Sequence, residues 1–153
     1  MAETVFEGID AVRAAVGNHL GFSDWTTITQ EQVDTFAEAT GDHQWIHVDV
    51  ERANAESPFG GPIAHGYLTL ALTNLFLPQV VDVRGISLGV NRGTGKIRFP
   101  APVPVGSRLR AGVVLAAVAD VAGGIDTTMV ITVEREGADK PVCVVESLSR
   151  YLA

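Results

Sequence analysis

The residue types that can do acid–base chemistry gather in one short segment of the chain. From Asp42 to Asp49 the sequence reads Asp-His-Gln-Trp-Ile-His-Val-Asp, so two aspartates and two histidines lie close together. A carboxylate and an imidazole that converge on one water molecule can remove a proton from it and deliver a proton to a reacting carbon. Asp42 and His47 are therefore the candidate acid–base pair.

Each of these residues also has an ordinary structural explanation. Asp42 follows Gly41, and an aspartate there often accepts hydrogen bonds from the amides of a turn. His47 has apolar neighbours and fits a histidine packed in a loop. His43 and His47 with Asp49 suggest a metal site, but residues four apart converge on one ion only within a helix. Because Gly41 predicts that the helix has already ended, we expect no metal ion here.

The elements on either side of this segment have clear sequence signals. Thr29 and Gln32 have the form of a capping box, and apolar residues then recur on one helical face until Gly41. Residues 42–66 are rich in proline and glycine, which predicts mostly loop, with a helical turn at 51–56. The run 66–77 is apolar on almost every face and is closed by Pro78, which predicts a buried helix.

The rest of the chain predicts a curved antiparallel sheet. Residues 5–20 have helical apolar spacing, and 24–28 have the composition of a short strand. From residue 83 onward, apolar residues alternate in runs at 109–119, 125–133 and 142–151, with turn residues at 123–124 and 137–139. A helix ahead of such a meander indicates an α+β architecture in which the antiparallel sheet wraps around a buried central helix. We expect residues 1–153 to form a single domain.

The segment after Gly41 resembles the motif of the MaoC-like (R)-specific enoyl-CoA hydratases, in which Gly-Asp-x-Asn-Pro-aliphatic-His follows an aromatic residue, and a later His-Gly opens the central helix. The matching residues are Phe36, Gly41, Asp42, Ile46, His47, Ala64, His65 and Gly66. Gln44 and Trp45 stand where the family usually has Asn and Pro. The run 99–106 also resembles a strand-to-strand segment of these hydratases.

This resemblance implies a hot-dog fold and hydration of a trans-2-enoyl-CoA to the (R)-3-hydroxyacyl-CoA. It implies that Asp42 and His47 hold the attacking water, with no cofactor beyond the CoA of the substrate, and that the chain forms a homodimer with a continuous sheet. Two alternatives share the fold: an acyl-CoA thioesterase and a non-catalytic subunit that binds acyl thioesters.

Three further expectations concern substrate binding. The N–H of Gly66 at the start of the central helix suits the developing negative charge on the thioester oxygen. Ile63, Tyr67 and Trp45 are candidate walls of an acyl pocket. Arg92, Lys96 and Arg98 are candidates to bind the CoA phosphates, although surface charge on a strand is the commoner explanation for such residues. The run 89–96 fails the spacing of a phosphate-binding loop and predicts a strand connection.

Composition excludes several classes of partner. The net charge is −7 and basic residues form no stripe, which argues against nucleic acid. No apolar run is long enough to span a bilayer, and the N-terminal residues do not resemble a signal peptide, so we expect a soluble cytoplasmic protein without a membrane partner. Cys143 is the only cysteine and alternates with apolar residues, which predicts a buried, unreactive thiol.

Overall fold

A computed structural model describes residues 1–153. Its main sheet has the order β2-β6-β7-β8-β5, formed by β2 (His19–Phe22), β6 (Arg108–Val121), β7 (Gly124–Arg135), β8 (Pro141–Leu152) and β5 (Leu88–Arg98), with β3 (Thr26–Thr27) also paired to β6. All of these pairings are antiparallel. The turn between β6 and β7 uses Gly123 at φ 80°, and the turn after β7 uses Gly137 at φ 79°, so the predicted turn positions are confirmed.

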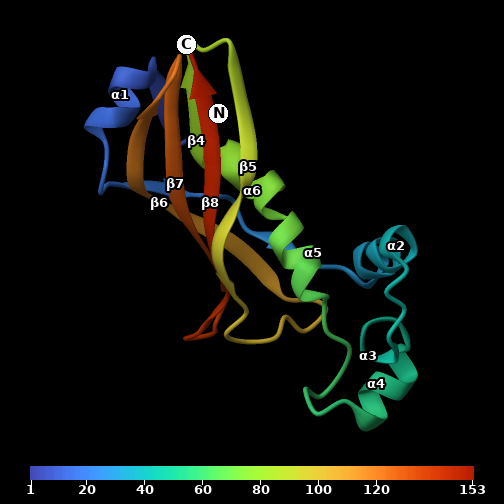
Figure 1. The fold of residues 1–153 in the computed structure, drawn as a ribbon. Coiled ribbons are helices and arrows are strands. Elements are labelled where there is room, and N and C mark those ends of the chain that lie inside the picture. The colour runs from blue at the N-terminus through green and yellow to red at the C-terminus, as the bar shows by residue number, and fades with distance from the viewer.

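The central helix runs along this sheet as two pieces, α5 (Gly66–Ala71) and α6 (Thr73–Val80) (Figure 1). Leu68 and Phe76 are buried in the main apolar cluster with inward-facing residues of the sheet. The helix differs from the prediction in two ways. It is interrupted at Leu72, where the Thr73 hydroxyl donates to the Leu70 carbonyl at 2.7 Å. It also continues through Pro78 to Val80.

Burial of the central helix is incomplete, which corrects the expectation of a helix covered on all faces. Tyr67 is 71% exposed and Leu75 is 44% exposed, on the face away from the apolar cluster. In the single chain this face is largely open to solvent, and Tyr67 contacts the edge of the Phe99 ring. None of the helices has the length and hydropathy needed to cross a bilayer.

The N-terminal segment contradicts the prediction of one helix over 5–20. It forms β1 (Thr4–Glu7), then α1 (Ile9–Ala14), and then enters β2. Gly8 at φ 89° and Gly17 at φ 91° divide the segment, because a right-handed helix cannot continue through these backbone angles. β1 pairs in parallel with β4 (Val81–Arg84), a partner that local spacing does not reveal.

Three helices form a group beyond the start of α5 (Figure 1). The first is α2 (Gln30–Thr40), confirmed with Thr29 as its cap: the threonine oxygen accepts a hydrogen bond from the Gln32 N–H at 3.1 Å. The others are α3 (Trp45–Val48) and α4 (Val50–Glu56). The segment 42–66 is therefore more helical than predicted.

Candidate active site

Asp42 leaves α2 directly after its C-terminal cap. Gly41 adopts the left-handed conformation, φ 81°, and its N–H donates to the Ala37 carbonyl, which ends the helix and turns the chain. The Asp42 carboxylate accepts only a long bond, 3.4 Å, from the Gln44 N–H, and the side chain is 53% exposed. The carboxylate is thus held near the turn and keeps acceptor capacity for another group.

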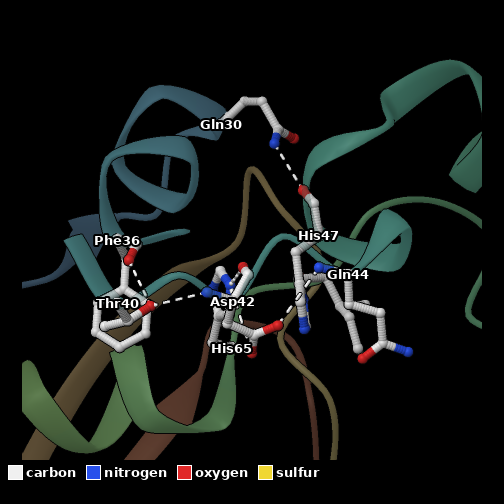
Figure 2. A network of polar contacts seen from close by, with 8 residues as sticks. Gln30, Phe36, Thr40, Asp42, Gln44, His47 and His65 are labelled. Atoms are coloured by element: carbon white, nitrogen blue, oxygen red, sulfur yellow. Dashed lines mark hydrogen bonds and ion pairs between the residues drawn. The ribbon is translucent and has the colours of Figure 1, made fainter. Parts of the chain in front are cut away.

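His47 lies on the single turn α3 and is buried. Its Nδ1 lies 2.7 Å from the Ile63 carbonyl, so Nδ1 carries the proton and Nε2 has a lone pair. The His47 carbonyl accepts a hydrogen bond of 2.8 Å from the Gln30 side chain of α2 (Figure 2). Two elements therefore hold the backbone and the ring of this residue.

Burial lowers the pKa of His47 below its ordinary value of 6.5, because it disfavours the charged ring. The Ile63 carbonyl opposes this shift, His65 adds to it, and the Asp42 carboxylate opposes it. The lowering prevails. His47 is therefore neutral near pH 7 and available as a proton acceptor.

His65 completes the cluster, with its ring stacked on His47 at a centroid distance of 3.9 Å. A ring nitrogen of each histidine and a carboxylate oxygen of Asp42 lie within 4.8 Å of one another (Figure 2). Such a set resembles metal ligands. The hydrogen bonds from His47 to the Ile63 carbonyl and from His65 to the Asp42 carbonyl each place a proton on one ring nitrogen, and the other nitrogen of each histidine keeps a lone pair.

His43 lies outside this cluster. Its Nε2 is 3.6 Å from a carboxylate oxygen of Glu38, on the exposed side of α2. Asp49 instead caps α4, where its carboxylate accepts the Arg52 N–H at 3.1 Å. The pair His43 and His47 thus does not converge, although His47 is on a helical turn, because His43 precedes that turn.

Gly66 begins α5 beside the cluster. The N–H groups of Leu68 and Thr69 donate to the His65 carbonyl, while those of Gly66 and Tyr67 have no acceptor within the chain. A Cβ on Gly66 would lie 3.2 to 3.3 Å from three atoms of the Phe99 ring. The amide is therefore unpaired, and the Phe99 ring occupies the space that a side chain at position 66 would need.

A cavity of about 410 Å³ starts at this point, lined by Ile63 and Gly66 together with Phe59 and Phe99. Two smaller cavities, of about 220 and 160 Å³, follow the helix and share Thr73 and Asn74. A larger one of about 580 Å³ lies against α2, and neither Asp42 nor His47 lines it. Asp42 and His47 do not line the cavity at Gly66 either. That cavity adjoins the acid–base cluster through Ile63, whose carbonyl contacts His47, and the larger cavity adjoins it through Phe36, which packs against His65.

The other two predicted pocket residues lie elsewhere in the single chain. Tyr67 points outward and contacts Phe99 edge-on, at a centroid distance of 6.4 Å. Trp45 is half-buried, and the Arg52 guanidinium lies 4.2 Å from its ring centroid. Neither lines a cavity.

The basic residues and the cysteine are also placed. Arg92 lies within β5, which corrects the predicted strand connection, and forms an ion pair of 3.0 Å with Asp126. Cys143 is buried in β8 as predicted, and burial raises its pKa to about 11.

Gln30 is a site residue that sequence reasoning missed, because nothing in its local sequence indicates a contact with His47.

Comparison with known proteins agrees with these features. Residues 11–136 match the family described as MaoC like domain. The chain is 55% identical over 149 residues to 3-hydroxyacyl-thioester dehydratase Z of Mycobacterium tuberculosis, covering 97% of this chain and 98% of that protein. It is 46% identical over 135 residues to nodulation protein N of Rhizobium meliloti, covering 85% and 82% respectively.

The fold is shared with solved structures. An unliganded R-hydratase from Pseudomonas aeruginosa superposes with a TM-score of 0.72 at 24% identity, covering 90% of this chain and 81% of that one. The predicted hot-dog architecture is thereby confirmed. The family model matches most of the chain, and the chain is 55% identical to a named dehydratase. The chain therefore belongs to the MaoC-like dehydratase domain family.

Proposed function

We propose that this protein is an (R)-specific hydratase of trans-2-enoyl thioesters, which adds water to form the (R)-3-hydroxyacyl thioester and catalyses the reverse dehydration. The observation that carries the proposal is the approach of the Asp42 carboxylate and a His47 ring nitrogen to within 4.8 Å. The name of the relative at 55% identity, a 3-hydroxyacyl-thioester dehydratase, supports the same chemistry. The R configuration rests on the resemblance of the motif to the (R)-specific hydratases.

A separation of at most 4.8 Å between the Asp42 carboxylate and a ring nitrogen of His47 is compatible with one shared water molecule. A water that donates both protons at about 2.8 Å separates its two acceptors by roughly 4.4 Å, from its bond angle. Asp42 and the unprotonated Nε2 of His47 are both acceptors. A water held in this way turns its oxygen lone pairs away from both groups and toward a bound substrate.

The proton balance needs no cofactor. The water oxygen bonds to C3 of the enoyl group as one of its protons passes to the Asp42–His47 pair, and the π electrons move toward the thioester oxygen. The C2–C3 double bond becomes single in this step, which leaves an enolate with a C1–C2 double bond; the pair then delivers a proton to C2 on the same face, and the thioester carbonyl forms again. The Gly66 N–H stabilises the negative charge on the thioester oxygen between these events.

The substrate is an acyl thioester of CoA in this proposal. Its acyl group enters the cavity lined by Ile63 and Gly66, where apolar and aromatic side chains suit a hydrocarbon chain. Trp45 and Tyr67 remain proposed walls of the pocket. The outward position of Tyr67 fits a pocket that a second subunit completes.

We further propose a homodimer with a sheet continuous across both subunits. β5 is an edge strand that pairs only with β8, and most of its residues are exposed, including the apolar Leu88 and Val90. An exposed edge of this length is normally paired or covered. Light scattering is expected to give twice the chain mass for the wild type and a shift toward monomer for Val90→Lys; a monomeric wild type would contradict the proposal.

The test of the catalytic pair replaces Asp42 and His47 in turn and uses the same substitution at His43 as a control. We expect Asp42→Asn and His47→Gln each to lower crotonyl-CoA hydration on the order of 100-fold or more, the scale of general acid–base catalysis. His43→Gln, an exposed histidine nearby, should retain activity. Loss of the enoyl absorbance measures hydration, and an (R)-selective dehydrogenase identifies the product.

The alternatives give different results in the same assay. Release of free thiol without loss of the enoyl absorbance would indicate a thioesterase. Tight acyl-CoA binding without turnover at any chain length would indicate a non-catalytic binding subunit.

A further inference from the structure

His65 is a buried polar side chain at the site to which the proposed reaction assigns no role. Only 3% of it is exposed, and it immediately precedes the proposed oxyanion donor Gly66. Its carbonyl accepts the N–H groups of Leu68 and Thr69 at 3.1 and 3.2 Å, which starts α5. The backbone of His65 is therefore set by the central helix.

The ring of His65 is held between two aromatic side chains. His47 stacks on it with an interplanar angle of 26°, and the Phe36 ring of α2 packs at 4.9 Å, tilted by 56°. The His65 ring thus limits movement of the His47 ring on one side. The Ile63 carbonyl fixes that same ring through Nδ1.

His65 also forms a hydrogen bond with Asp42, the other member of the pair. Its Nε2 lies 3.0 Å from the Asp42 carbonyl and donates to it, but it lies 3.9 Å from the nearer carboxylate oxygen. The bond therefore fixes the backbone of Asp42 and leaves the carboxylate for water. Nδ1 of His65 is buried without a partner, so the ring gains only one hydrogen bond from its two nitrogens.

We propose that His65 is a positioning residue that holds Asp42 and His47 in the relative geometry needed to share one water molecule. The inference rests on the hydratase function proposed above. His65 is the side chain that contacts both members of the pair, one through its backbone carbonyl and one through its ring. Misplacement of reacting groups by about 1 Å can lower a rate on the order of 100-fold.

Two variants separate the ring from the hydrogen bond. His65→Phe keeps an aromatic ring between Phe36 and His47 but removes the donor to Asp42. His65→Gln removes the ring and supplies an amide N–H in its place. We expect His65→Phe to lower kcat for crotonyl-CoA by about 10- to 100-fold with little change in KM, and His65→Gln to recover part of that loss.

The pH profile distinguishes positioning from a contribution to folding alone. Asp42 and His65 are the titratable groups that act on the pKa of His47; Phe36 and Gln30 from α2 and the Ile63 carbonyl are uncharged. Removing the imidazole of His65 removes its lowering effect, so the acidic limb of kcat/KM should move to higher pH in both variants. A change in the folded fraction alone would leave that limb in place.

The outcomes are separable. Two results would overturn the positioning role and leave the hydratase proposal unaffected. One is a wild-type kcat in both variants. The other is a loss of activity equal to the unfolded fraction measured by circular dichroism, with no shift of the acidic limb of kcat/KM. A wild-type protein that hydrates no enoyl thioester overturns both. Reduced kcat in folded His65→Phe with partial recovery in His65→Gln supports the role.

Discussion

Substitution of Gly66 by alanine tests the proposed close approach of the thioester to the start of α5. The new Cβ would lie 3.2 Å from Cε2 of Phe99 and 3.3 Å from Cδ2 and Cζ, closer than the usual 3.5 to 4.0 Å between carbon atoms. The ring must move by a few tenths of an ångström, at a cost on the order of 1 kcal/mol. Alanine offsets up to about 1 kcal/mol of this through its higher helix propensity.

The expected change in the free energy of unfolding is therefore about 1 kcal/mol or less, which corresponds to a shift in Tm of roughly 2 to 4 °C. Activity should fall much further. In the proposed binding mode the added methyl group would stand beside the unpaired amide and crowd the thioester, and losing one oxyanion donor typically costs about 100- to 1000-fold. A displaced donor should cost less, on the order of 10- to 100-fold in kcat/KM.

The assay combines thermal unfolding with hydration of crotonyl-CoA, and the double variant Gly66→Ala with Phe99→Leu identifies the cause. Phe99→Leu removes Cε2 and Cζ, two of the three ring atoms that the Cβ would meet, and should restore much of the stability without restoring activity. Wild-type turnover in Gly66→Ala would refute the assigned approach of the thioester. Full rescue by the second substitution would show that the Phe99 contact alone causes the loss.

Three other outcomes follow from burial. Because burial lowers the pKa of His47, the acidic limb of kcat/KM should have an apparent pKa below 6.5, which a pH–rate series measures. The contribution of His47 to stability should be present above its unfolded pKa and be lost as the pH falls through its folded pKa, which denaturant unfolding at a series of pH values measures. With its pKa raised to about 11, Cys143 should resist iodoacetamide at pH 8 in the folded protein and react after unfolding, as mass spectrometry would record. Phe76→Ala should cost about 3 to 5 kcal/mol in urea unfolding, because the side chain is fully buried.

Local signals were sufficient for several parts of this protein. The cap at Thr29 and the stop at Gly41 predicted α2 and the emergence of Asp42, because capping and left-handed turns depend on residues a few positions apart. Alternation and glycine turns likewise predicted β6, β7 and β8. The spacing of Asp42 and His47 with a later Gly66 was enough to suggest the chemistry.

Local spacing misled where pairing or exposure is nonlocal. Residues 5–20 have apolar residues at helical intervals, yet Thr4–Glu7 pairs with Val81–Arg84, a strand far along the chain. The central helix is apolar nearly all round, but Tyr67 and Leu75 remain exposed because no element of the same chain covers that face.

The working geometry of the site was decided by tertiary structure alone. The carbonyl of Ile63, 16 residues along the chain, fixes the tautomer of His47 by accepting a hydrogen bond from Nδ1. The ring of His65 donates a hydrogen bond to the carbonyl of Asp42, 23 residues before it. Residue types and spacing determined which groups are available for the reaction. Packing of α2, α3 and the start of α5 determined the neutral state of the His47 ring and its distance from Asp42, because burial and nonlocal hydrogen bonds act only once these elements are assembled.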